Sequence, residues 1–430
     1  MKGKLRATPS RGLSGRIAVP GDKSMSHRAL ILGAMAEGET RIEGLLESDD
    51  VLATARAVEA LGADVERLGE GRWRVTGGPW RSPDAPIDCG NSGTAARLLM
   101  GAAAGRGVTA TFTGDASLRA RPMDRVVAPL AAMGATIEGG DRLPITVRGG
   151  QLRGIAFDNV FGSAQVKSAI LLAGLGTDGA VSVREDRPSR DHSEIMLGAF
   201  GCAVEREGKI IALPAHRQLR ATQVTVPCDP SSAAFPLVAA LLTAGSDLTV
   251  TGTLANPLRT GLYKTVREMG ADIRFEEERE VGGEAVADVT VRTSALRGVT
   301  VPANRAPAMI DEYPVLAVVA AFAEGPTVMH GLGELRVKES DRLAAIADGL
   351  AACGVRAEVE DDALTVHGCG GPARAADIFT QGDHRIAMSF LVAGIAGQHA
   401  VTVDRADMIA TSFPGFADLM RGIGARIATA

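Results

Sequence analysis

The stretch Met133-Gly134-Ala135-Thr136-Ile137 decides the fold class, because versions of it return throughout the chain. In each version a helix-like run ends in glycine and a small residue, and a short apolar strand follows. The other versions are residues 61–65, 200–204, 269–273, 353–355 and 423–427. Along the chain, the six glycines of the phrase are separated by 72, 67, 69, 84 and 70 residues. This period exceeds that of a solenoid repeat and predicts a larger supersecondary unit.

A second helical run precedes most of these glycines and leads into a β-branched strand. These helix and strand pairs are 28–37 with 38–42, 164–174 with 180–183, 233–244 with 247–250, 313–323 with 326–328, and 386–396 with 400–403. Another alternating strand usually closes the unit, at 73–75, 144–147, 209–213, 289–291 and 364–366. Each unit therefore reads strand, helix, strand, helix, strand, strand, which predicts an α/β fold. Chance similarity among alanine-rich helices is the alternative, and six near-regular returns argue against it.

The repeats also predict two lobes. The phrase Val-Pro-Gly-Asp-Lys-Ser at 19–24 is echoed by Val-Pro-Cys-Asp-Pro-Ser at 226–231, and each precedes an apolar helix. We therefore expect one lobe of three repeats at 20–227 and a second at 1–19 plus 228–430, with hinges near 19–23 and 226–231. The acidic run at 276–280, followed by two glycines, is expected to be a solvated loop.

Composition excludes several classes of protein. A length of 430 residues with 46% hydrophobic content predicts two or three domains with substantial cores. A formal net charge of -5 and only 3% aromatic residues argue against a nucleic-acid binder. Five cysteines without CxxC spacing predict a reduced compartment, the cytoplasm, and no structural zinc. No apolar run is long enough to cross a membrane, and the basic first 21 residues read as part of the fold rather than a targeting signal.

Several expected helix starts carry groups that bind anions. Free N–H groups and the positive dipole end of a helix attract phosphate or carboxylate, so Lys23 and Arg28 in the segment 20–28 suggest such a site. Simple capping by Ser24 or Ser26 is the alternative, and the nucleotide-binding P-loop pattern is missing. Similar starts lie at 89–94, before a helix with Arg97, and at 161–167, which adds a hydroxyl, an amide and an amine.

Further charges gather at other repeat junctions. Carboxylates occupy 311–312, and basic segments lie at 119–122, 336–342 and 383–385. Taken alone, 338–342 is typical of a helix with a row of exposed ion pairs. If the fold brings these repeat junctions into one cleft, their arginines would instead bind carboxylate and phosphate groups through two hydrogen bonds each. His27 and His384 are expected to pack within these segments, and no histidine spacing or GxSxG elbow predicts a metal site or serine nucleophile.

Together these segments resemble the enolpyruvyl transferase family, and within it the 5-enolpyruvylshikimate-3-phosphate synthases (3-phosphoshikimate 1-carboxyvinyltransferases), over essentially the whole chain. The matching phrases are Pro-Gly-Asp-Lys-Ser at 20–24, Gly-Asn-Ser-Gly-Thr at 90–94, Arg-Pro-Met at 121–123, Ser-Ala-Gln-Val-Lys-Ser at 163–168, Arg-Val-Lys-Glu-Ser-Asp-Arg at 336–342 and Asp-His-Arg-Ile-Ala-Met at 383–388. The resemblance implies a two-lobed inside-out α/β barrel of six βαβαββ repeats, three in each lobe.

The same resemblance implies transfer of the enolpyruvyl group of phosphoenolpyruvate to the 5-hydroxyl of shikimate 3-phosphate, with release of phosphate. This is a step of the shikimate pathway, towards chorismate and the aromatic amino acids. The chemistry needs an acid, a base and a cationic clamp, all of which side chains supply, so no cofactor or metal is expected. The expected partners are these two small molecules, without nucleic acid or membrane, and the expected form is a monomer.

Matching motif positions imply the site residues. Shikimate 3-phosphate is expected to meet Lys23, Ser24, Arg28, Ser163, Ala164 through its backbone, Gln165, Arg190, Asp311 and Lys338. Phosphoenolpyruvate is expected to meet Lys23, Gly93, Thr94, Arg121, Gln165, Arg342 and Arg385. The catalytic residues are expected to be Asp311 as base for the 5-hydroxyl, Glu339 for proton transfer at the enol carbon, and Lys23 to neutralise both ligands.

Some positions resemble a second branch of the family, which includes glyphosate-insensitive members. Ala164 stands where the better-known branch has serine, the segment 189–192 replaces its Ser-Lys-Pro-Tyr, and Thr411 replaces a lysine. The insensitive members carry alanine where this chain has Gly93, so glyphosate sensitivity is expected.

Two rival interpretations stay open from the sequence. UDP-N-acetylglucosamine enolpyruvyl transferase shares the fold and donor, but usually has cysteine at the position of Ala116. A non-catalytic anion-binding repeat protein would explain the basic helix starts but not the placement of Asp311 and Glu339. Two lobes joined by short crossovers also predict closure around ligand, which small-angle scattering with and without shikimate 3-phosphate would detect.

Overall fold

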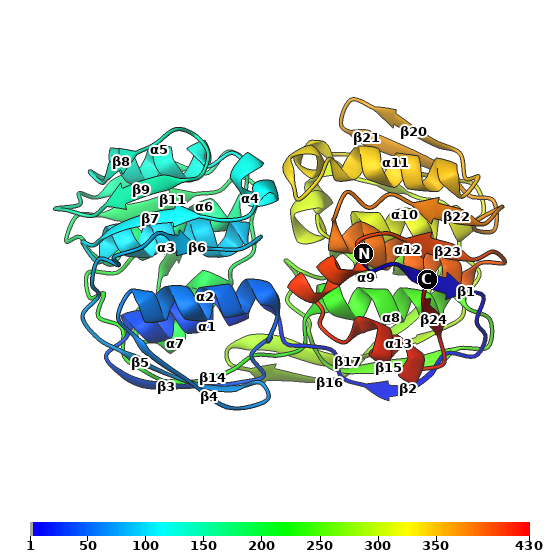
Figure 1. Cartoon of the computed structure of the whole chain (residues 1–430), viewed down its shortest axis with the longest axis horizontal. Coiled ribbons are helices and arrows are strands. Elements are labelled where there is room, and N and C mark those ends of the chain that lie inside the picture. Colours follow the sequence, from blue (N-terminus) through cyan, green and yellow to red (C-terminus); the bar gives the residue numbers. More distant parts are fainter. Residues whose placement is uncertain (1–2) are drawn as a thin grey trace. The chain divides into compact units, whose positions relative to one another are not determined.

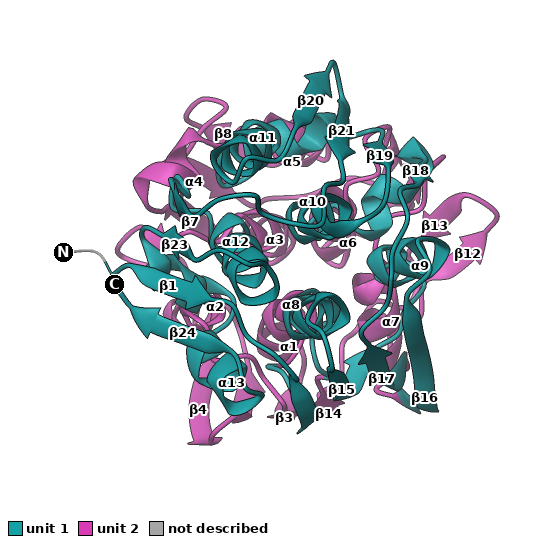
Figure 2. Ribbon diagram, turned by 90° about the vertical axis from the view of Figure 1, so that its right-hand side faces the viewer, with its two compact units in different colours: residues 1–20, 227–280, 285–430 teal, residues 21–226, 281–284 magenta. Residues whose placement is uncertain are grey.

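The protein, described by a computed structural model over residues 3–430, folds into two compact units. Unit 2 comprises Gly21–Val226 and Val281–Glu284, and unit 1 comprises the segment up to Pro20 together with Pro227–Glu280 and Ala285–Ala430 (Figure 2). Each unit contains three four-stranded sheets, and each sheet belongs to one repeat. The α/β fold of six βαβαββ repeats, the two-lobed inside-out barrel, is thereby confirmed.

Unit 2 holds the first three repeats (Figure 1). The first contains β14 (Gln223–Thr225), α1 (Lys23–Met35), β3 (Gly38–Glu43), α2 (Asp49–Ala60), β4 (Asp64–Gly69) and β5 (Arg72–Gly77). The second contains β6 (Ile87–Asp88), α3 (Gly93–Gly105), β7 (Thr109–Thr113), the short α4 (Ala116–Ala120), α5 (Asp124–Ala132), β8 (Thr136–Glu138) and β9 (Ile145–Arg148). The third contains β10 (Ile155–Asp158), α6 (Ala164–Gly174), β11 (Val181–Arg184), α7 (His192–Ala199), β12 (Glu205–Glu207) and β13 (Ile210–Ala212).

Unit 1 holds the other three repeats. The fourth contains β2 (Ser14–Ile17), α8 (Pro230–Leu242), β15 (Asp247–Leu254), α9 (Gly261–Glu268), β16 (Asp272–Val281) and β17 (Glu284–Arg292). The fifth contains β18 (Thr300–Val301), η1 (Ala303–Ala308), α10 (Tyr313–Phe322), β19 (Pro326–Met329), η2 (Gly333–Val337), α11 (Arg342–Ala352), β20 (Ala357–Glu360) and β21 (Ala363–His367). The sixth contains β22 (Ala376–Ile378), α12 (His384–Ala396), β23 (Val401–Val403), η3 (Ala406–Thr411), α13 (Phe416–Gly422), β24 (Arg426–Thr429) and β1 (Leu5–Thr8).

Every sheet has the same strand order, in which the first two strands pair in parallel across a helix. Three sheets receive a strand from a distant part of the chain. The strand β14 pairs with β3, with Val224 opposite Ile42, and β2 pairs with β15, with Gly15 opposite Leu248. The strand β1 lies between β23 and β24, so that the beginning of the described chain completes its last sheet. Strand pairing thus closes the series of repeats.

The glycines of the repeated phrase end the second helix of each repeat. All six have positive φ, between 77° and 114°: Gly62, Gly134, Gly201, Gly270, Gly354 and Gly424. This left-handed region suits glycine, which turns the chain from helix to strand at no steric penalty. The strands begin slightly later than the sequence predicts in two repeats, at Glu205 and Ala357, because the residues immediately after the glycine complete the turn.

Three buried helices form the centre of each unit. In unit 1 they are α8, α10 and α12, grouped together in Figure 2, and in unit 2 they are α1, α3 and α6. In unit 1 almost every residue of these helices is buried, and most of them are apolar, as is typical of a helix covered on all sides. Gly101 permits the close approach of α3 to α6, since a Cβ there would lie 2.3 Å from the Ala169 carbonyl oxygen. No helix within residues 3–430 is long and apolar enough to span a membrane.

The prediction of a solvated loop at 276–280 is wrong, because this acidic run lies inside the long strand β16. Its side chains are exposed, but its backbone is held beside β17, whose inward residues include Val289 and Val291. Pairing with β17 is the physical reason that this run forms a strand, and the sequence of the polar run does not indicate that pairing. The tip of this hairpin belongs to unit 2, where Glu284 lies 2.6 Å from Nδ1 of the buried His192.

Candidate active site

Each of the three central helices of unit 2 begins at a residue whose side chain caps the helix N-terminus. Asp22 accepts a hydrogen bond from the Met25 amide at 2.8 Å, and Ser92 accepts one from the Ala95 amide at 3.1 Å. Ser163, itself a predicted site residue, caps α6. The predicted residues of the first turns are Lys23 and Ser24 on α1, Gly93 and Thr94 on α3, and Ala164 and Gln165 on α6. Their positions at helix N-termini favour an anionic ligand.

The start of α1 holds two cations in different ways. The Lys23 ammonium lies 2.5 Å from Oδ2 of Asp50, at the start of α2, and its side chain is 17% exposed. Arg28 is buried, and its guanidinium donates to Ser193 Oγ at 2.7 Å, Ser168 Oγ at 2.8 Å and the Ser24 carbonyl at 2.9 Å. Arg28 therefore ties the starts of α1, α6 and α7 together, while Lys23 keeps access to solvent.

The starts of α3 and α6 are joined directly. Gln165 donates to Thr94 Oγ1 at 2.8 Å and accepts from Arg97 at 2.8 Å, so two predicted residues meet. Arg97 also donates to the Pro122 carbonyl at 2.9 Å, next to Arg121. This arrangement orients amide and guanidinium groups around the helix N-termini.

Gly93 leaves room for the arginines of this region. A Cβ there would lie 2.8 Å from Nη1 of Arg97 and 3.3 Å from Nη1 of Arg121. Arg121 is mostly buried and donates to Asn91 Oδ1 at 2.8 Å. The structure thus brings the predicted residues Gly93 and Arg121 together.

His27 lies beneath these helix starts and is fully buried. Its Nδ1 is 2.7 Å from Thr54 Oγ1 and its Nε2 is 3.4 Å from Ser92 Oγ. Burial, followed by the charges of Lys23 and Arg28, lowers the pKa of His27 well below its ordinary value of 6.5. The imidazole is packed and hydrogen-bonded in the interior, as expected from the sequence.

The predicted residues of the third repeat stand on two neighbouring loops. Ser163 and Ala164 open α6, and Arg190 lies half-buried in the loop before α7. The expectation that Lys167 adds an amine to the anion site is wrong, because its side chain is fully buried and contacts Glu185 at 2.9 Å and Glu194 at 2.7 Å. Its position on the inward face of α6 gives the physical reason.

Arg342 is the centre of the predicted residues in unit 1. It is the first residue of α11, and its side chain is only 1% exposed. Its guanidinium reaches Asp383 at 2.7 Å, Asp311 at 3.1 Å and Glu339 at 2.5 Å. Burial would lower the pKa of Arg342, but these three carboxylates outweigh burial and raise it. The exposed ion-pair stripe considered for 338–342 is excluded, because Lys338 and Glu339 precede the helix and Arg342 is buried.

Arg385 and the start of α10 adjoin this cluster. Arg385 donates to the Asp311 carbonyl at 3.2 Å, and its Nη1 lies 3.6 Å from Glu312 Oε1. Glu312 is buried and also accepts from Ser231, at the start of α8. Asp311, Glu339, Arg342 and Arg385 are therefore brought together, and Lys338 follows η2 one residue before Glu339. The predicted site residues form two groups, one in each unit, and each group lies at the starts of central helices.

Several supporting residues lie outside the predicted set of binding residues. Arg97, noted in the sequence only as a basic residue of the helix after 89–94, contacts Gln165, and Asp383, noted only as part of the segment 383–385, caps α12. Asp50 and Glu185 come from other segments of the chain, and only the fold brings them to Lys23 and Lys167. Local sequence carries no signal for such partners.

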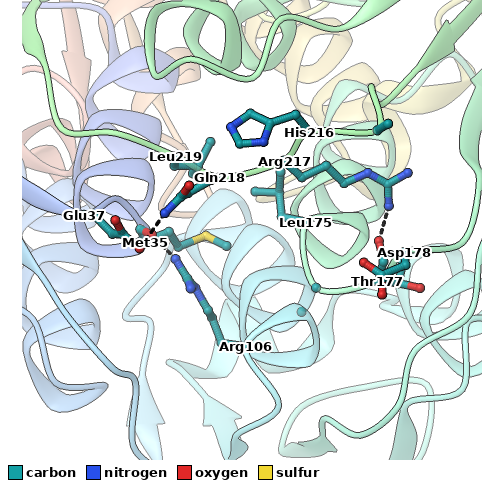
Figure 3. A pocket seen from close by; sticks show the side chains of 13 residues that line it. Met35, Glu37, Arg106, Leu175, Thr177, Asp178, His216, Arg217, Gln218 and Leu219 are labelled. Atoms are coloured by element: carbon teal, nitrogen blue, oxygen red, sulfur yellow. Dashed lines mark hydrogen bonds between the residues drawn. The ribbon is translucent and has the colours of Figure 1, made fainter.

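A cavity of about 410 Å³ lies at the other end of the central helices of unit 2 (Figure 3). It is lined by Met35, Arg106 and Leu175 near the helix ends, and by the segment 215–219. Arg217 donates to the Gly174 carbonyl at 3.0 Å, and Gln218 donates to Glu37 at 2.8 Å. None of the predicted site residues lines this cavity. Among the described residues, no group of three or more His, Cys, Asp or Glu side chains is arranged to hold a metal ion.

The chain is similar in sequence to known proteins over nearly its whole length. The family model of EPSP synthase (3-phosphoshikimate 1-carboxyvinyltransferase) matches residues 7–420. The 3-phosphoshikimate 1-carboxyvinyltransferase of Caulobacter vibrioides (strain NA1000 / CB15N) is 56% identical, covering 99% of both chains. That of Phenylobacterium zucineum (strain HLK1) is 58% identical, covering 98% of this chain and 95% of its own.

The chain is also similar to solved structures over its whole length. EPSP synthase from Acinetobacter baumannii superimposes with a TM-score of 0.88 at 41% identity, covering 100% of both chains. The enolpyruvyl transferase NikO from Streptomyces tendae gives a TM-score of 0.77 at 21% identity, again over 100% of both chains, and shows the shared fold.

Proposed function

Because this chain belongs to the EPSP synthase (3-phosphoshikimate 1-carboxyvinyltransferase) family, we propose that it transfers the enolpyruvyl group of phosphoenolpyruvate to the 5-hydroxyl of shikimate 3-phosphate and releases phosphate. The observation that carries the assignment of residues is Arg342, which holds Asp311 and Glu339, the two carboxylates proposed for proton transfer, on one guanidinium. Acid and base are thereby held on one buried guanidinium.

The proposed reaction has two stages. Glu339 delivers a proton to C3 of the enol while C2, which becomes cationic, is captured by the 5-hydroxyl oxygen, and Asp311 accepts the hydroxyl proton. The resulting tetrahedral adduct then loses phosphate from C2, and Glu339 takes back a proton from the new methyl group, which restores the double bond. The proton that Asp311 took from the hydroxyl leaves with the released phosphate. Lys23 neutralises charge on both ligands and assists the departure of phosphate.

The proposed binding residues form one set for each substrate, and three residues or more of each set lie at helix starts. Phosphoenolpyruvate binds Lys23, Gly93, Thr94, Arg121, Gln165, Arg342 and Arg385, and shikimate 3-phosphate binds Lys23, Ser24, Arg28, Ser163, Ala164, Gln165, Arg190, Asp311 and Lys338. Support comes from the joined positions of Thr94 and Gln165 and from the helix dipoles of α1, α3 and α6. All these groups come from one chain, so the monomer is proposed as the working form. Five free cysteines support the cytoplasm as its compartment.

Phosphate release tests the proposal directly. The purified protein is incubated with phosphoenolpyruvate and either shikimate 3-phosphate, UDP-N-acetylglucosamine or no acceptor. We expect one phosphate to be released per phosphoenolpyruvate consumed in the incubation with shikimate 3-phosphate, and no release in the other two incubations. Release with the UDP-sugar instead would favour the sister enzyme, which the exposed Ala116 at the start of α4 argues against. No release with either acceptor would leave only an anion-binding protein.

A further inference from the structure

Lys167 is charged and yet completely buried in unit 2. Its ammonium contacts Glu185 Oε2 at 2.9 Å, Glu194 Oε1 at 2.7 Å and the Ser189 carbonyl at 3.4 Å. Both glutamates are also buried, and Arg206 lies 3.6 Å from Glu194. The proposed reaction uses none of these four side chains, so their charges need another explanation.

Glu185 connects this cluster to the loop that carries Arg190. Its Oε1 accepts from the Ser189 hydroxyl at 2.5 Å, and its Oε2 accepts from the Ser189 amide at 3.2 Å. One carboxylate therefore fixes both the side chain and the backbone of the residue immediately before Arg190. Ser189 is buried, whereas Arg190 is partly exposed.

The same carboxylate reaches the start of α6 through Asn159. The Asn159 amide donates to Glu185 Oε1 at 2.7 Å and to the Ser163 carbonyl at 3.0 Å, and its oxygen accepts from the Ser163 amide at 3.2 Å. The two loops also approach each other closely, because a Cβ at Gly162 would lie 3.2 Å from the Arg187 carbonyl oxygen. The loops that carry Ser163 and Arg190 are thus joined through one buried carboxylate.

Stability alone does not account for this arrangement. Desolvation of buried ions offsets much of their attraction, and apolar side chains of similar volume often serve a core equally well. Apolar side chains, however, could not hold the Ser189 and Ser163 backbones by directional hydrogen bonds. What the charged cluster adds is a defined geometry for two loops.

We propose that Lys167, Glu185, Glu194 and Asn159 are positioning residues that hold Ser163 and Arg190 at the spacing required to bind the phosphorylated hydroxy acid acceptor. The cluster touches neither substrate, and it acts on acceptor affinity rather than on proton transfer. This inference rests on the proposed function, since it takes shikimate 3-phosphate as the acceptor.

Glu185→Gln is the decisive variant. The amide keeps the volume of the side chain, but it replaces one acceptor oxygen with an NH₂ group. In one orientation this NH₂ faces Lys167 and the Ser189 amide, and in the other it faces the Asn159 amide and the Ser189 hydroxyl. Either orientation sets donor against donor. We expect the Kd and KM for shikimate 3-phosphate to rise about tenfold or more, with KM for phosphoenolpyruvate changed less than about twofold.

A matched control separates positioning from general destabilisation. Glu47→Gln makes the same change in unit 2, where Glu47 accepts from Arg67 at 2.8 Å and from Trp73 at 2.9 Å, and contacts no proposed site residue. It is expected to leave both KM values unchanged. Ser189→Ala is a milder second variant, which removes one hydrogen bond to Glu185 and is expected to weaken shikimate 3-phosphate binding about threefold.

Calorimetric binding of shikimate 3-phosphate and hydrogen exchange at the Ser189 amide provide readouts beside turnover. Weakened acceptor binding with faster exchange in Glu185→Gln and Ser189→Ala supports the inference. If both variants bind shikimate 3-phosphate as the wild type does, the positioning role is wrong while the proposed function stands. If the wild type itself does not bind shikimate 3-phosphate, the proposed function fails and this inference fails with it.

Discussion

The helix starts of unit 2 and those of unit 1 surround their arginines with different chemical groups. In unit 2, Arg28 donates to hydroxyl and carbonyl oxygens, and Arg97 donates to an amide and a carbonyl oxygen. In unit 1, the single guanidinium of Arg342 meets three carboxylates. Neutral oxygens hold a guanidinium by hydrogen bonds alone, whereas carboxylates also balance its charge. Unit 2 has a carboxylate at a helix start as well, because the Lys23 ammonium meets Asp50.

This difference suggests a division of work between the two groups of residues. Oriented cations at helix N-termini suit the binding of anions, as in unit 2. Carboxylates gathered on a buried guanidinium, as in unit 1, are held in fixed positions. Under the proposed function we expect unit 2 to contribute most to the binding of anions and unit 1 to contribute most to proton transfer.

The largest expected effect comes from the carboxylates of unit 1. Asp311→Ala and Glu339→Gln should each lower kcat about 10²- to 10⁴-fold, because each removes a proposed proton-transfer group. Binding of shikimate 3-phosphate should change far less. Steady-state kinetics together with calorimetry measure the two effects separately. Near-normal turnover in either variant would contradict the role assigned to that residue.

The next effect compares one arginine from each unit. Arg342→Lys and Arg121→Lys should both raise KM for phosphoenolpyruvate about tenfold, because an ammonium cannot form the bidentate contacts of a guanidinium. Arg342→Lys should also lower the free energy of unfolding by about 2 kcal/mol, more than Arg121→Lys does, since lysine cannot reach three carboxylates at once. Denaturant titration of the two variants measures this. Equal losses of stability would remove the distinction between the units.

A smaller effect concerns Gly93 in unit 2. Gly93→Ala should raise the concentration of glyphosate needed for half inhibition about tenfold, because the new methyl group presses on Arg97 and Arg121 and narrows the space for the longer inhibitor. The backbone of Gly93 is helical and accepts alanine without strain. Gly198→Ala in α7, where a Cβ meets nothing closer than 4.0 Å, is the control. Unchanged inhibition in Gly93→Ala would rule out the steric argument.

The smallest effect is the pH dependence contributed by His27. Its pKa is lowered in the folded state, so below pH 6.5 the unfolded chain binds a proton that the folded chain does not. Stability is therefore lost as the pH falls from 6.5 towards the folded pKa, by at most about 1.4 kcal/mol per pH unit. His27→Gln should flatten this part of the stability curve in denaturant titrations from pH 7 to pH 5. The same change at the exposed His216 is the control, and an unaltered slope in His27→Gln would contradict the prediction.

Much of the fold follows from the glycines of the repeated phrase. Gly134 and its five equivalents have positive φ at the ends of helices, a conformation that the residue type itself makes accessible. The alternating strands and apolar helices around them follow from side-chain periodicity. The acidic strand β16 was not predictable in this way, since its pairing with β17 fixes its conformation.

In the candidate site, too, the sequence predicts local features but not contacts between distant segments. The sequence by itself determined the repeats and the helix starts that carry Lys23 and Gly93, because these depend on local periodicity, caps and motifs. Only the tertiary structure decided that Lys167 is buried between glutamates and that Arg342 meets Asp311, Glu339 and Asp383. Burial and ion pairing depend on segments far apart in the chain, so no local pattern encodes them.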